Sequence, residues 1–141
     1  MMRPRIVVPE TPDRADRDII LARLVECEAA AAGPPEIKSL AVLLKDEAQR
    51  TIGGLWGTSV FRWLVVEYVL IPDDCRGLGL GTELMRRAEA VARERNCIGI
   101  WLDTYSFQAR GFYEKFGFTM FGEVAEHPPG HQRHFMQKLL Q

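Results

Sequence analysis

Several features are missing from this sequence. No apolar run approaches the roughly 18 residues that a membrane-spanning helix needs. The formal net charge is −1 at pH 7, which gives no general attraction to nucleic acid or to an anionic membrane. Near the start of the chain, the apolar stretch covers only residues 6–8, too short for the core of a signal peptide. These absences predict a cytoplasmic protein with neither nucleic acid nor membrane as partner.

Cysteine is also scarce. Cys27, Cys75 and Cys97 are odd in number and widely spaced, with no CxxC pair and no clustered histidines beside them. A disulfide framework or a zinc site needs paired or clustered ligands. We therefore expect three reduced thiols and no bound metal.

Nothing in the sequence divides the chain into parts. It is 141 residues long, and it contains no internal repeat, no low-complexity tract and no long Pro/Gly/Ser linker. Single domains most often have about 100–150 residues. We therefore predict one domain over residues 1–141.

Hydrophobic periodicity gives the order of the expected elements. Residues 61–72 are apolar on both faces in their second half, which is typical of a central strand. Residues 82–95 carry one apolar stripe, made of Leu84, Met85, Ala88, Val91 and Ala92. The alternation predicts a mixed α/β sheet, with strands at 5–8, 37–46, 51–60, 61–72 and 98–105, helices at 13–31, 82–95 and 107–116, and a hairpin over 119–140.

The segment "RGLGLG" (76–81) lies between an expected strand and an expected helix. Glycines let the backbone approach a ligand, and a helix N-terminus favours an anion. A phosphate or pyrophosphate ligand is one interpretation, and a bare structural turn is the other. No lysine follows the glycines, which excludes a P-loop. Thr82 replaces the third glycine of a dinucleotide fingerprint, and the remaining chain is too short for that fold.

At these residues the sequence resembles a known family. "RGLGLG" matches the R/Q-x-x-G-x-G/A motif of the GNAT superfamily of acyl-CoA-dependent N-acetyltransferases, and "SFQARGFYEKFGF" (106–118) resembles its second motif. The resemblance covers about residues 37–140, and the sequence looks especially like a group of small bacterial members of unassigned substrate. It implies the GNAT fold: a mixed, mostly antiparallel sheet of about six or seven strands, with a splayed parallel strand pair and flanking helices.

The resemblance also implies a cofactor site for acetyl-CoA. In the family, backbone amides of the glycine loop hold the pyrophosphate, here those of Arg76, Gly77, Leu78, Gly79, Leu80, Gly81 and Thr82. The leucines at 78 and 80 are then expected to point into the protein. The pantetheine arm is expected to pair with Val69, Leu70 and Ile71. Ser106 stands where many members have Asn, and Ser106 or Gln108 would replace that contact.

Two residues are the catalytic candidates. Tyr113 matches the family's general acid beside the sulfur, although a purely structural core aromatic is the alternative. Glu67 is the only acid within the central strand and is the candidate base, with an outward-facing or salt-bridged carboxylate as the alternative. For the acceptor we expect contacts from Asp103 and His131. Further candidates for the base are Asp103, Glu126, His127, His131 and His134.

The expected function is direct transfer of the acetyl group of acetyl-CoA to the primary amine of a small molecule. A protein or peptide acceptor is one alternative, and a non-catalytic acyl-CoA-binding module is another. Terminal hairpins of GNAT proteins often build dimers, so a homodimer is also expected.

Overall fold

The computed structural model describes residues 2–140. The chain divides into two compact units, Met1–Pro35 and Glu36–Gln141.

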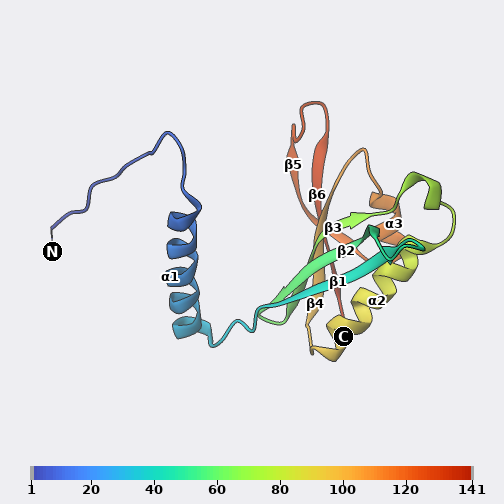
Figure 1. Cartoon of the computed structure of the whole chain (residues 1–141), viewed down its shortest axis with the longest axis horizontal. Helices are drawn as coiled ribbons and strands as arrows, with labels where there is room; N and C mark the ends of the chain where they lie inside the picture. The colour runs from blue at the N-terminus through green and yellow to red at the C-terminus, as the bar shows by residue number, and fades with distance from the viewer. Residues whose placement is uncertain (1, 141) are drawn as a thin grey trace. The chain divides into compact units, whose positions relative to one another are not determined.

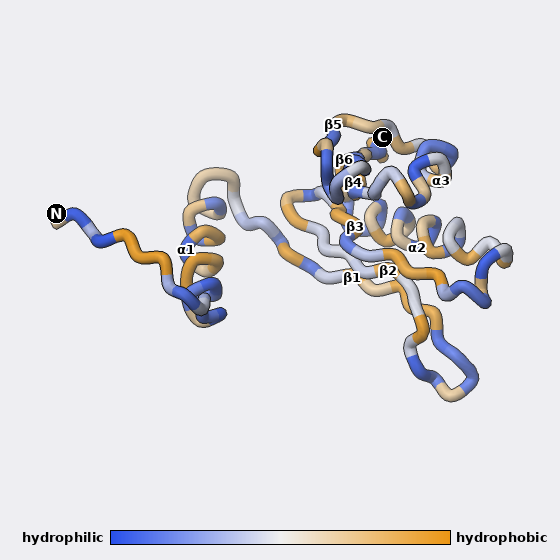
Figure 2. The backbone as a smooth tube through the Cα atoms, turned by 90° about the horizontal axis from the view of Figure 1, so that it is seen from above, coloured by the Kyte–Doolittle hydropathy of each residue, from blue (hydrophilic) through white to orange (hydrophobic). Residues whose placement is uncertain are grey.

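The first unit contains one helix, α1 (Arg14–Ala32). Asp13 caps its N-terminus by accepting a hydrogen bond from the Ala15 amide at 2.9 Å, and Gly33 ends it with a positive φ of 84°. The expected strand at residues 5–8 is wrong. This stretch is hydrophobic (Figure 2), but within residues 2–140 no strand pairs with it, and unpaired extended backbone is not a strand.

The second unit is a six-stranded sheet in the order β1-β2-β3-β4-β6-β5 (Figure 1). All neighbours are antiparallel except β3 and β4, which confirms the expected fold class. The strands are β1 (Lys38–Lys45), β2 (Thr51–Val60), β3 (Trp63–Leu70), β4 (Gly99–Tyr105), β5 (Thr119–Ala125) and β6 (Gln132–Leu139). The helices are a 3-10 turn, η1 (Asp73–Cys75), and two α-helices, α2 (Leu80–Glu94) and α3 (Arg110–Lys115).

The core forms where α2 runs along one face of the sheet (Figures 1 and 2). The predicted apolar stripe of α2 is confirmed, because Leu84, Met85, Ala88 and Ala92 are buried and Val91 is half-buried. They pack against core side chains of the sheet, among them Leu64, Ile100 and Met136. Removal of this apolar surface from water is the main stabilising contribution to the unit.

The parallel pairing of β3 and β4 is short. It runs from Trp63↔Gly99 to Val66↔Leu102 and then stops. On its other side β3 pairs with β2, where Gly57 faces Val66 and Trp56 faces Tyr68, so Glu67 is the extra residue of a β-bulge. A bulge bends its strand and increases the local twist. β3 and β4 therefore separate beyond Val66, and this opening positions the site.

Some boundaries differ from those expected. α2 begins at Leu80 rather than at residue 82, and α3 covers only Arg110–Lys115. β3 begins at Trp63, because Phe61 and Arg62 have positive φ and form the two-residue turn from β2. Such turns match the twist of the flanking strands. Within residues 2–140, no helix is long and apolar enough to cross a membrane.

Glu89 joins α2 to β6. Its carboxylate accepts a hydrogen bond from Lys138 Nζ at 2.6 Å and is paired with Arg93 at 3.3 Å. Burial alone would raise the pKa of Glu89, but the hydrogen bond from Lys138 and the charges of Lys138 and Arg93 outweigh it and lower the pKa. A carboxyl with a lowered pKa stabilises the fold above its unfolded pKa, and that contribution is lost as the pH falls through the folded pKa.

We therefore expect Glu89→Gln to lower the free energy of unfolding at pH 7 by about 1.5–3 kcal/mol, the range for hydrogen bonds to charged groups. The deficit should be smaller at pH 3 than at pH 7, because the wild-type carboxyl becomes neutral as the pH falls through its lowered pKa. Urea unfolding at both pH values measures it. Glu83→Gln is the control, because the Glu83–Arg87 pair is exposed and such pairs contribute about 0–1 kcal/mol. An equal deficit at both pH values would contradict the prediction.

Candidate active site

The glycine loop presents a row of free backbone amides. Within the described residues, the N–H groups from Gly77 to Thr82 donate to no protein acceptor, and the Glu83 amide is the first to bond, to Gly79 O at 3.2 Å. The Arg76 amide is engaged, donating to Asp73 O at 3.3 Å. Gly77 and Gly79 have φ of 81° and 74°, and no atom lies within 4 Å of the place where a Cβ would stand. The loop is an anion cradle at a helix N-terminus.

The expectation that the leucines of this loop point inward is wrong for Leu78. Its side chain is 70% exposed, because the two left-handed glycines on either side turn it outward. Leu80, at the start of α2, is half-buried. Gly81 lies against α3, where a Cβ would stand 3.6 Å from the Phe112 ring. The Arg76 guanidinium is paired with Asp73 at 3.2 Å at the surface.

Beyond the bulge, β3 has one free edge. Tyr68, Val69 and Leu70 pair with β2, but none of them pairs with β4. On β4, residues Asp103–Tyr105 pair with β6 and likewise not with β3. Unpaired backbone groups of a strand edge are a template for another extended chain. Val69 and Ile71 are half-buried against the core, and Leu70 is exposed.

Tyr113 lies on α3, on the core side of the sheet. It is 9% exposed and packs edge-to-face against Phe112 and Phe118, with ring centroids 5.1 and 6.0 Å away. Burial, and secondarily the negative charge of Asp103, raise the pKa of Tyr113. Within residues 2–140 its hydroxyl makes no hydrogen bond, and it is not among the fully buried atoms without a partner. The hydroxyl thus stays protonated at neutral pH and retains access to solvent.

Glu67 lies on the other side of the sheet. Its Oε2 accepts a hydrogen bond from Thr58 Oγ1 at 3.3 Å, and Thr58 alternates with the core-facing residues Gly57 and Ser59 along β2. The carboxylate is exposed to solvent. Glu67 and Tyr113 therefore approach the opening between β3 and β4 from opposite faces of the sheet.

Asp103 is held by a residue that the sequence did not single out. Arg133 of β6 donates two hydrogen bonds of 2.8 Å to its carboxylate, and the same bonds raise the pKa of Arg133. The guanidinium also lies over the rings of Tyr105 and Phe135, 5.8 and 5.2 Å from their centroids. Only the register of β4 on β6 brings this pair together, so no local sequence pattern indicates it.

Ser106 and Gln108 hold the loop after β4 by side-chain hydrogen bonds to neighbouring strands. Ser106 Oγ accepts from the Gln132 amide at 3.0 Å and lies 3.5 Å from His131 Nδ1. Gln108 Oε1 accepts from the Tyr105 amide at 3.0 Å and from Thr104 Oγ1 at 3.3 Å. Both side-chain oxygens are thus used within the protein, whereas the side-chain nitrogen Nε2 of Gln108 makes no hydrogen bond to the part of the chain that is described.

The remaining candidates for the base, with His131 also a candidate for acceptor contact, belong to the β5–β6 hairpin. His131 is exposed and meets the Phe107 ring edge-on at 4.9 Å, and His127 meets the Tyr105 ring at 5.7 Å. Glu126 Oε2 accepts from the Gly130 amide at 3.3 Å within the turn. His134 is 5% exposed on the core side, with Nδ1 3.3 Å from Glu123 Oε1 but without hydrogen-bond geometry.

No group of three or more His, Cys, Asp or Glu side chains in residues 2–140 is arranged to hold a metal ion. The three cysteines are free, with Cys97 buried, Cys75 half-buried and Cys27 exposed.

A free amide loop beside a splayed parallel pair is the arrangement that the GNAT resemblance implies. The model of the acetyltransferase (GNAT) family matches residues 9–118. The chain belongs to the GNAT acetyltransferase family. Acetyl coenzyme A is therefore its co-substrate, as expected from the two motifs.

Similar proteins agree with this assignment. Blasticidin-S acetyltransferase of Streptomyces morookaense is 42% identical over 89 residues, which are 62% of this chain and 65% of that protein. Acetyltransferase Atu2258 of Agrobacterium fabrum is 29% identical over 132 residues, 94% of this chain and 96% of that protein. The crystal structure of an acetyltransferase from Agrobacterium tumefaciens is 28% identical in sequence to this GNAT chain. The two structures superpose with a TM-score of 0.92 over 97% of this chain and 100% of that one.

One more distant GNAT structure was solved with the co-substrate. A streptothricin acetyltransferase structure from Bacillus anthracis, in complex with acetyl coenzyme A, is 22% identical, with a TM-score of 0.63 over 73% of this chain and 63% of its own. At that identity the likeness concerns the fold.

The shifted pKa of Tyr113 can be tested directly. Asp103→Asn removes a negative charge that disfavours the tyrosinate and leaves the Arg133 cation nearby, so the pKa of Tyr113 should fall. Because burial is the larger cause, the pKa should remain above the ordinary value. NMR titration of the ring carbon in labelled tyrosine measures it. Asp74→Asn is the control, and an unchanged Tyr113 transition in Asp103→Asn would contradict the prediction.

Proposed function

We propose that this GNAT protein transfers the acetyl group of acetyl-CoA directly to a primary amine of a small molecule. The observation that carries the proposal is the end of β3–β4 pairing at Val66 and Leu102, next to the six free amides from Gly77 to Thr82. An extended pantetheine arm and a pyrophosphate need these two features side by side.

The residues fit the co-substrate. Amides of the loop after η1 would hold the pyrophosphate, and the free edge at Val69, Leu70 and Ile71 would pair with the pantetheine arm. The co-substrate supplies an acetyl thioester, and the protein supplies position and proton transfer. Partial desolvation and the Asp74 carboxylate raise the pKa of the Cys75 thiol, which disfavours a covalent route through that residue.

Two proton transfers complete the reaction. The attacking amine must lose a proton, and the carboxylate of Glu67 is the acceptor for it, directly or through water. Asp103 suits this role less well, because both of its oxygens are bonded to Arg133. The departing sulfur takes a proton, and the Tyr113 hydroxyl donates it. Its raised pKa keeps this proton available over the physiological range.

The amine is proposed to belong to a small molecule. Support comes from the relative named for blasticidin S, with which this chain shares 42% identity over 89 residues. A protein or peptide acceptor is the alternative, and comparing free amines with a lysine-bearing protein as acceptors separates the two. A homodimer and a cytoplasmic location remain predictions.

A ligand screen tests the co-substrate site. At a hundredfold excess over Kd, acetyl-CoA should stabilise the folded protein by about 2.7 kcal/mol, because it binds only the folded state. Thermal unfolding with acetyl-CoA, CoA and NAD measures this effect, with NAD as the control that gives no shift. Stabilisation by NAD but not by acetyl-CoA would overturn the assignment of the loop.

Substitution of Tyr113 tests the acid. Loss of a general acid costs about 10²- to 10⁴-fold, so Tyr113→Phe should lower kcat at least about 100-fold. The Kd for acetyl-CoA should not change, since the ring remains. Steady-state release of the CoA thiol measures kcat. Tyr68→Phe is the matched control, since Tyr68 is 74% exposed on β3. An unchanged kcat in Tyr113→Phe would contradict the role of Tyr113 as general acid and would leave it a structural role in the core.

A further inference from the structure

A groove lies on the face of the sheet that α2 does not cover. It has a volume of about 550 Å³ and is lined by Val60, Trp63, Trp101, Phe121, Phe135 and Gln137. Trp101 alternates along β4 with the core residues Ile100 and Leu102, so its indole points away from the core. The volume lies within the range of about 300–1,000 Å³ that is typical of small-molecule sites.

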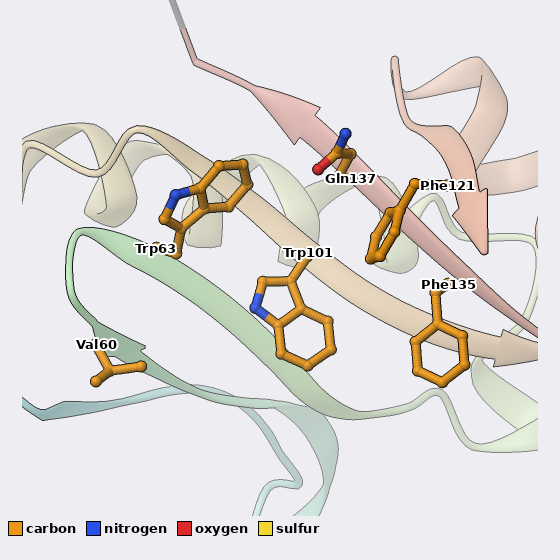
Figure 3. A pocket seen from close by; sticks show the side chains of 6 residues that line it. All are labelled: Val60, Trp63, Trp101, Phe121, Phe135 and Gln137. Atoms are coloured by element: carbon orange, nitrogen blue, oxygen red, sulfur yellow. The ribbon is translucent and has the colours of Figure 1, made fainter. Parts of the chain in front are cut away.

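The groove crosses the sheet rather than following one strand. Its walls come from β2, β3, β4, β6 and β5 in turn. Neighbouring strands lie about 4.8 Å apart, so the crossing is roughly 19 Å long. In Figure 3 the Trp101 indole lies between Val60 and Trp63 on one side and Phe121 and Phe135 on the other. A molecule of several rings fits such a length.

The groove lies on the same face of the sheet as the proposed base. Phe135 faces Asp103 across the β4–β6 ladder, and Asp103 is on β4 just beyond the end of parallel pairing. At the other end, Val60 lies two residues from Thr58, which donates to Glu67. A molecule in the groove therefore reaches the opening between β3 and β4 from the face that carries Glu67.

The lining has a definite chemistry. It holds two indoles and two phenyl rings but no charged side chain, and the Phe121 and Phe135 centroids are 6.3 Å apart. Gln137 is the one polar member, and its side-chain amide makes no hydrogen bond to residues 2–140. A Cβ at Gly99 would stand 2.6 Å from the Trp63 ring, so the glycine lets that indole lie close over β4.

We propose that this groove selects the acceptor, and that the acceptor is a primary amine on a planar aromatic or heteroaromatic body. The proposal rests on the acetyltransferase function proposed above. Flat rings stack on Trp and Phe side chains, and the ammonium of an arriving amine is attracted to indole faces. The free amide of Gln137 offers both a donor and an acceptor to ring heteroatoms.

The first test compares acceptors. Tryptamine, histamine and 4-nitrobenzylamine should show KM values about tenfold or more below those of butylamine, putrescine and spermidine, as burial of a ring predicts. Equal kcat/KM for aromatic and aliphatic amines would overturn the proposal. Stabilisation by acetyl-CoA is measured separately and tests the proposed function. A protein that binds acetyl-CoA but does not prefer aromatic amines would therefore contradict the role of the groove and not the proposed function.

The second test uses a matched pair of variants on the edge strand β5. Phe121 is 53% exposed and lines the groove, whereas its neighbour Met120 is 41% exposed and does not line it. Phe121→Ala should raise KM for the aromatic amines about tenfold and leave KM for spermidine unchanged, with acetyl-CoA binding retained. Met120→Ala should change neither. A parallel rise of KM for both amine classes in Phe121→Ala would contradict a specific role.

The third test needs no turnover. Two of the three tryptophans, Trp63 and Trp101, line the groove, and Trp56 does not. Saturable quenching of indole emission by 4-nitrobenzylamine should persist in Trp56→Phe and weaken in Trp101→Phe. Quenching lost only in Trp56→Phe would contradict the proposal. Emission that changes with protein concentration and resists the amine would assign the groove to a second copy of the chain instead.

Discussion

The parallel ladder between β3 and β4 ends after four residue pairs, and the rest of the site depends on that ending. Hydrogen bonds that would have joined the two strands are left unmade at Val69, Leu70 and the facing part of β4. Unsatisfied backbone groups are costly when buried, so such an edge must face solvent or an extended ligand. At this opening, the backbone hydrogen bonds of the two strand edges can therefore be completed only by solvent or by an extended ligand that lies between them.

The two faces of the sheet carry different groups of proposed site residues around that opening. On the core side, α2 and α3 bring the free amides of the glycine loop and the hydroxyl of Tyr113 to one end of the strands. On the open side, Glu67, Asp103 and the aromatic groove are reached from solvent. Separate approaches for the acyl donor and the amine would let both bind at once, as direct transfer requires.

Much of the fold, and part of the candidate site, could be predicted from local sequence. The apolar stripe of α2, the central position of β3 and the glycine-rich turn are encoded by residues close together in the chain. The strand expected at residues 5–8 failed because strand formation needs a partner, which β-branched residues alone do not supply. The outward Leu78 and the Arg133–Asp103 pair were missed for related reasons: backbone handedness and cross-strand register are not visible in residue type.

The bulge at Glu67 also reverses the alternation of side chains along β3. Before it, Leu64 and Val66 face the core, and after it Val69 and Ile71 do so, an odd step between the two sets. A one-residue change in strand length exchanges inward and outward positions. The bulge thus accommodates one extra residue at position 67 while Val69 and Ile71 remain on the core side. Deletion of residue 67 would leave Val66, Val69 and Ile71 facing the core in regular alternation. It would remove the bend of the strand, and with it the separation of the edge on which the pantetheine arm is proposed to lie.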